Sequence, residues 1–143
     1  MRWAIFSAFL FICAIASAAD EAADPPVALR GHCPVCLIDA DHVSPGKQEF
    51  SSTYKGYKYL FPRKRTKDKF DANPDRYAIQ LDGYSPVSRA DGKDEKGDPA
   101  IYAVYNKKIY IFTNEQQREE FVKDAADILD LREADKTARP DRG

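Results

Sequence analysis

Two cysteines, Cys33 and Cys36, are the residues of this chain best suited to chemistry, and they form a Cys-x-x-Cys pattern. Two thiolates at this spacing can bind one tetrahedral metal ion, and both Zn²⁺ and Cu⁺ accept thiolate ligands. The residues near enough in sequence to add further ligands are His32, His42, Asp39 and Asp41. The pattern therefore predicts a site for one Zn or Cu ion, formed by the two cysteines and some of these four residues.

The same pair of cysteines has two other interpretations. In an oxidising compartment Cys33 and Cys36 can form a disulfide, which closes a very short loop and so adds little stability. The third interpretation is thiol–disulfide exchange, because the motif reads Cys-Pro-Val-Cys. Redox-active pairs commonly lie at a helix N-terminus, which lowers the pKa of the thiol. Residues 37–46 have a poor helix-forming sequence, which argues against exchange chemistry.

The rest of the sequence does not indicate an enzyme. It contains no Ser-His-Asp set, no paired-carboxylate signature and no phosphate-binding loop. The basic run Arg63-Lys64-Arg65, with Lys67 and Lys69, is interpreted as a solvated helix face. A formal net charge of −1 provides no general attraction to nucleic acid, so no nucleic-acid partner is expected.

The first residues predict export. Arg2 precedes an apolar run from Trp3 to Ile15, and small residues follow at positions 16–19. This order of charge, apolar core and small residues is typical of a cleaved signal peptide. The run is too short to span a bilayer, for which about 20 residues are needed. We therefore expect a periplasmic or secreted protein with no membrane span after cleavage, whose partner is a metal ion or another exported protein.

An internal repeat organises the remaining chain. The run 31–36 matches the run 83–88, residues 54–61 match 105–112, and Phe70 matches Phe121. Each copy predicts a β-hairpin followed by a helix, since alternating apolar residues surround a two-residue turn. One such unit buries too little apolar surface to be stable alone. The predicted fold is therefore α+β, with two tandem hairpin-plus-helix units packed into one compact domain.

The first unit resembles the YHS domain, a family of small domains linked to metal handling. The motifs that carry the resemblance are Cys33-Pro34-Val35-Cys36, Tyr54-Lys55-Gly56, Tyr59-Leu60-Phe61, Phe70 and Asn73-Pro74-Asp75-Arg76-Tyr77. The cysteines that complete the metal site in this family would fall near Pro62 and Thr66, and neither residue can supply a thiolate. The second unit is a degenerate copy, with Ser85 and Ser88 in place of the two cysteines. The family's metal chemistry therefore carries over only to Cys33 and Cys36.

Together these patterns predict five segments and one main function. The segments are a signal peptide (1–19), a flexible lead (20–28), a YHS-like unit (29–79), a degenerate YHS-like unit (80–131) and a charged disordered tail (132–143). The expected function is that of an exported, non-enzymatic protein that binds or handles a metal ion. The alternatives are an interaction module with a Cys33–Cys36 disulfide and no metal, and a thiol–disulfide protein.

Overall fold

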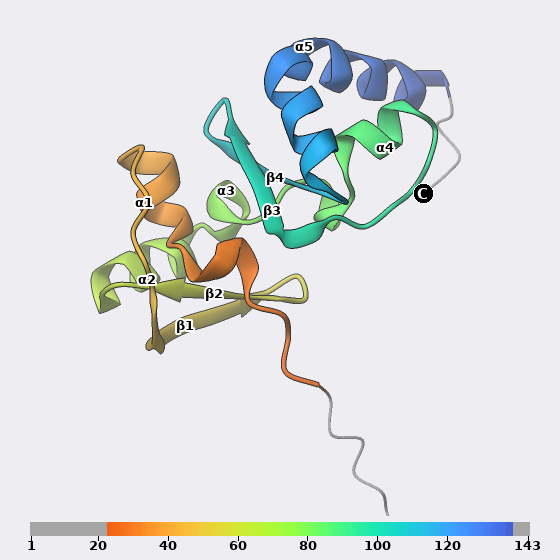
Figure 1. Cartoon of the computed structure of the whole chain (residues 1–143). Helices are drawn as coiled ribbons and strands as arrows, with labels where there is room; N and C mark the ends of the chain where they lie inside the picture. The colour runs from red at the N-terminus through yellow and green to blue at the C-terminus, as the bar shows by residue number, and fades with distance from the viewer. Residues whose placement is uncertain (1–22, 139–143) are drawn as a thin grey trace, which may run out of the picture.

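The computed structural model describes residues 23–138, so the predicted signal peptide and residues 139–143 lie outside the described part (Figure 1). Two antiparallel β-hairpins alternate with helices, which confirms the predicted α+β fold. The elements are η1 Ala28–Gly31, α1 Pro34–Asp39, β1 Lys47–Tyr54, β2 Tyr57–Phe61, α2 Lys64–Ala72, α3 Pro74–Tyr77, η2 Leu81–Gly83, α4 Pro86–Ala90, β3 Asp98–Tyr105, β4 Lys108–Phe112 and α5 Glu115–Ala138. Over the described residues, no helix is both long and apolar enough to cross a membrane.

Both hairpins turn through the two residues that the sequence indicates. Lys55 and Gly56 have φ of 48° and 81°, and Asn106 and Lys107 have φ of 50° and 59°. Positive φ at both central residues defines the type I′ turn, whose twist matches that of the flanking strands. Lys55 and Lys107 adopt this conformation without being Gly, Asn or Asp, so each turn carries some backbone strain.

The two halves repeat each other in backbone detail. A bulge interrupts both pairings, in the register between Lys47 and Ser51 and again between Asp98 and Tyr102. Left-handed residues recur in η1 and η2, and isolated bridges join each N-terminal segment to a strand of its hairpin: Val27 to Lys58 and Ile79 to Ile109. Such agreement at irregular positions indicates two copies of one structural plan, as the sequence repeat predicts.

Each unit has its own aromatic centre, and strand β4 connects the two. Phe61 and Phe70 are fully buried in the first cluster, and Phe112 and Phe121 in the second, as the matched positions predict. Ile109 and Ile111 of β4 also belong to the first cluster. Since alternate side chains of a strand point to opposite faces, β4 contributes one face to each cluster.

Both ends of the described chain are more ordered than the sequence predicts. The lead was expected to extend to residue 28, yet Ala28 is fully buried and Pro26 accepts a hydrogen bond from Lys58 N at 3.0 Å. The tail was expected to be disordered from residue 132, yet α5 continues to Ala138. That stretch is mostly good helix formers, whose propensity outweighs the lack of an apolar period. The remaining tail, 139–143, lies outside the described residues.

The start of α5 is capped by a side chain of the turn that precedes it. Thr113 and Gln116 have the spacing of a capping box. In the structure Asn114 is the capping residue, because its Oδ1 accepts a hydrogen bond from Gln117 N at 2.9 Å. The Gln117 side chain is thereby held at the end of β4, where it takes part in the network described below.

Candidate functional site

The Cys-x-x-Cys pair lies at the start of a short helix. Cys33 is the N-cap of α1, and its Sγ accepts a hydrogen bond from Cys36 N at 3.4 Å. The expectation of no helix after Cys36 was wrong over its first residues, since α1 extends to Asp39. Proline at the first helical position and burial of Leu37 and Ile38 stabilise this turn despite the poor propensity of the sequence.

Both cysteines are free thiols with different exposure, so the disulfide alternative is not present in the structure. Cys33 is 0% exposed, and the pKa of its thiol is raised to about 12. Burial is the main cause, and a hydrogen bond with the Cys36 side chain is the second. Cys33 is therefore protonated at neutral pH and is a poor metal ligand or nucleophile there. Cys36 is 9% exposed and contributes to the wall of a pocket.

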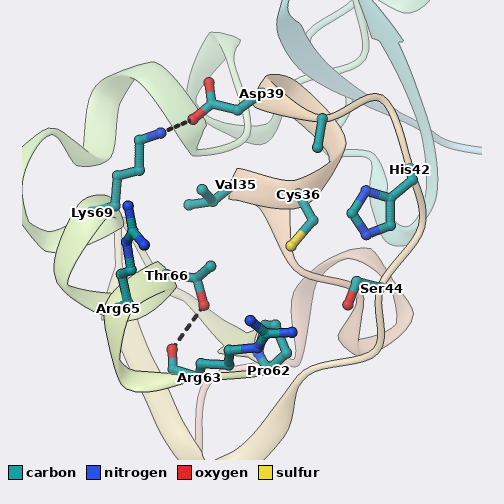
Figure 2. A pocket seen from close by; sticks show the side chains of 11 residues that line it. Val35, Cys36, Asp39, His42, Ser44, Pro62, Arg63, Arg65, Thr66 and Lys69 are labelled. Atoms are coloured by element: carbon teal, nitrogen blue, oxygen red, sulfur yellow. Dashed lines mark hydrogen bonds and ion pairs between the residues drawn. The ribbon is translucent and has the colours of Figure 1, made fainter.

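A pocket of about 440 Å³ opens beside Cys36, between α1, the loop that follows it and the start of α2 (Figure 2). Figure 2 shows Cys36 and His42 facing this space from one side, with Thr66 and Arg63 on the other. The full lining is Val35, Cys36, Asp39, Ala40, His42, Ser44, Pro62, Arg63, Arg65, Thr66 and Lys69. Pro62 and Thr66, the two positions that the resemblance in sequence singled out, thus both line this pocket.

The other predicted ligands do not assemble around the two cysteines. His32 lies on a different face, where its Nδ1 is 2.9 Å from the hydroxyl of Tyr102 in the second unit. Asp41 forms an ion pair with Lys107 at 3.0 Å. Only Asp39 and His42 line the same pocket as Cys36.

Asp39 is committed to other partners. Its carboxylate binds Lys69 at 2.5 Å and Arg76 at 3.0 Å, and accepts a hydrogen bond from the Tyr77 hydroxyl at 3.0 Å. Burial alone would raise the pKa of Asp39, but these hydrogen bonds outweigh it and lower the pKa below its usual value. Asp39 therefore serves as an anchor between α1, α2 and α3.

The donor set does not fit a resident metal ion. No group of three or more His, Cys, Asp or Glu side chains suited to a metal occurs among the residues that the structure describes. A structural zinc site takes four such ligands, and a catalytic one takes three. Arg63, Arg65 and Lys69 also line the pocket and repel a cation.

The equivalent region of the second unit is filled by its own side chains. Ser85 and Ser88 are buried in place of the two cysteines. Ser85 Oγ donates to Gln117 Oε1 at 2.7 Å, and Gln117 Nε2 donates to Ser88 Oγ at 2.9 Å. Ser88 Oγ in turn donates to Glu95 Oε2 at 2.6 Å. The lost thiols are thus replaced by a continuous hydrogen-bond network, which satisfies these buried hydroxyls.

Sequence reasoning missed the pocket and four of its polar residues. Ser44, Arg63, Arg65 and Lys69 line it, although the basic run was interpreted as a solvated face. A signal was present in the repeat, because Thr66 and Ser44 align with Gln117 and Glu95. Where one copy has short side chains and the other has long side chains at the aligned positions, a space is expected to be open in the first copy and filled in the second.

Comparison with known proteins supports the resemblance of the first unit. Residues 34–80 match the family model of the YHS domain, which confirms the family suggested by the Cys-Pro-Val-Cys and Asn-Pro-x-x-Tyr motifs. The search of curated proteins and the search of solved structures each gave no match.

Proposed function

Since residues 34–80 are a YHS domain, we propose that the protein is an exported, non-enzymatic binding protein whose ligand occupies the pocket beside Cys36. The family is linked to metal handling, so a ligand site at this place in the fold is expected. The observation that carries the proposal is the pocket itself, which lies at the matched positions Cys36, Pro62 and Thr66. The signal-like sequence of residues 1–19 supports export, which N-terminal sequencing of the mature protein checks.

A non-metal ligand suits the pocket better than an ion does. Its volume of about 440 Å³ lies within the range of about 300–1,000 Å³ that small-molecule sites occupy. Of the two cysteines only Cys36 lines it, and Cys33 is held protonated by burial at neutral pH.

The proposal is tested by nuclear magnetic resonance with ¹⁵N-labelled protein and a panel of small organic acids, amines and amides. We expect at least one class to cause saturable shifts of the amides of Cys36, Ser44 and Thr66. The double substitution Ser44→Glu with Thr66→Gln introduces the side chains that fill the second unit, and should abolish these shifts. A panel that leaves all three amides unmoved in the native protein would contradict the proposal.

A second candidate function is transient carriage of a soft metal ion. The observation in its favour is that Cys36 and His42 line one pocket, where they could hold Zn²⁺ or Cu⁺ as cargo with few protein ligands. The neighbouring guanidinium groups and the protonated Cys33 oppose it.

Titration of the reduced protein with Zn²⁺ or Cu⁺ decides between the two functions. The matched variant is Cys33→Ser with Cys36→Ser, which removes both thiols at nearly constant volume. We expect no difference in metal uptake between the native protein and this variant at equimolar ion. One ion bound per native chain, and none per variant chain, would establish metal carriage instead.

A further inference from the structure

The second unit of the protein shows what the pocket of the first unit lacks. The backbone pairings of the two units are equivalent, since Cys33 N donates to Ser44 O at 2.8 Å and Ser85 N donates to Glu95 O at 2.9 Å. Ser44 therefore corresponds to Glu95 in structure as well as in sequence. Thr66 corresponds in the same way to Gln117, because each is the third residue of the helix that follows its hairpin.

These two replacements determine whether the space is open or filled. In the second unit the Glu95 carboxylate and the Gln117 carboxamide both hydrogen-bond to the Ser88 hydroxyl. In the first unit the corresponding side chains are the short Ser44 and Thr66, and Thr66 Oγ1 turns back to donate to Arg63 O at 2.7 Å (Figure 2). The volume beside Cys36 that a carboxylate and an amide would occupy is thus left open.

The open space is lined by more positive charge than the corresponding region of the second unit. Arg63, Arg65 and Lys69 line the pocket, whereas the corresponding residues of the second unit are Asn114, Gln116 and Glu120. Lys69 is paired with Asp39. Neither Arg63 nor Arg65 has an ion-pair partner within residues 23–130, whose side chains the structure describes. Two guanidinium groups are therefore available to an anionic ligand.

From this comparison we propose that the pocket binds a small organic carboxylate, held by Arg63 and Arg65 in the space that Glu95 and Gln117 fill in the second unit. Guanidinium groups bind carboxylates through paired, charge-assisted hydrogen bonds, which makes arginine the suitable residue for this task. The Ser44 hydroxyl and the Cys36 thiol supply further weak polar contacts at the inner wall. The proposal rests on the pocket being the ligand site, as argued above, and adds the chemical class of the ligand.

The experiment compares three probes with the same five-carbon chain and different end groups: glutarate, glutaramide and 1,5-diaminopentane. Affinities are measured by titration of ¹⁵N-labelled protein. We expect glutarate to bind and to shift the amides of Ser44 and Thr66, and the diamine not to bind. Arg63→Gln with Arg65→Gln should weaken glutarate binding about tenfold or more, because both charge-assisted contacts are lost.

The matched control is Lys64→Gln with Lys67→Gln. It removes the same charge from the same segment, but these lysines pair with Asp68 and Asp71 and do not line the pocket. We expect this control to change glutarate affinity less than about twofold, since exposed charges act weakly at a distance. Equal losses in the two double variants would overturn the proposal, because binding would then follow net charge and not the pocket.

The remaining outcomes separate this proposal from the proposed function. Binding of glutaramide or the diamine but not glutarate, abolished by Ser44→Glu with Thr66→Gln, would keep the pocket as the ligand site and overturn the carboxylate. Inorganic phosphate is titrated separately as a reference anion, and tighter binding of phosphate than of glutarate would overturn the carboxylate while keeping an anionic ligand. No binding by any probe would overturn this proposal, and the wider panel described above would then decide on the pocket itself.

Discussion

Phe70→Ala is expected to lower the free energy of unfolding by about 3–5 kcal/mol. Phe70 is 1% exposed and its ring centroid lies 4.9 Å from that of Tyr59 and 5.2 Å from that of Phe61. Truncation removes these contacts and leaves a cavity at the centre of the first cluster. Small domains have a total stability of about 5–15 kcal/mol, so the loss is a large part of the whole.

Phe121→Ala should have an effect of similar size, because Phe121 is packed in the same way in the second unit. Its centroid lies 5.1 Å from those of Tyr110 and Phe112. Chemical denaturation followed by circular dichroism measures both losses. Val122→Ala is the control, since Val122 is adjacent but 62% exposed, and it should change stability by less than about 1 kcal/mol. A loss at either phenylalanine no larger than that of the control would contradict the assigned core.

Gly46→Ala is the substitution with the next largest expected effect, because there is no room for a side chain. A Cβ at Gly46 would lie 2.3 Å from the backbone carbonyl carbon of Leu60 on the neighbouring strand. A backbone atom cannot move aside as the end of a flexible side chain can, so the hairpin must shift. We expect a loss of about 1–3 kcal/mol or more in the free energy of unfolding.

Gly97→Ala should reproduce this effect in the second unit, where a Cβ would lie 2.7 Å from Ile111. Gln48→Ala serves as the control, because Gln48 is exposed on β1, the strand that begins directly after Gly46. This substitution should change the free energy of unfolding by no more than about 0.5 kcal/mol. Thermal melts of the three variants measure the differences. If both glycine variants had the same melting temperature as Gln48→Ala, the close approach of the strands would be disproved.

The fold was largely predictable because its signals are local. Alternating aromatic residues around Lys55-Gly56 and Asn106-Lys107 determine two hairpins, and each hairpin needs a helix to cover its apolar face. The lengths of α1 and α5 were not predictable in this way. Helix α1 depends on the tertiary burial of Leu37 and Ile38, which overrides the weak propensity of their surroundings.

The candidate site was predictable only in part, because it depends on which distant side chains meet. The Cys-x-x-Cys pattern led to Cys36, and the family pattern led to Pro62 and Thr66. Spacing alone suggested His32 and Asp41 as ligands, but tertiary structure directs His32 to Tyr102 and Asp41 to Lys107. A ligand set assembled from neighbours in sequence fails where the chain turns those side chains toward other partners.

The shared position of strand β4 affects how the protein unfolds. Its Ile109 and Ile111 belong to the first cluster, while Tyr110 and Phe112 belong to the second. Unfolding either unit alone would expose one apolar face of this strand to water. A state with one unit unfolded therefore has little advantage in free energy over the fully unfolded chain. The two repeats therefore behave as a single cooperative folding unit. Neither repeat can be removed without leaving the core of the other open, because β4 belongs to both cores.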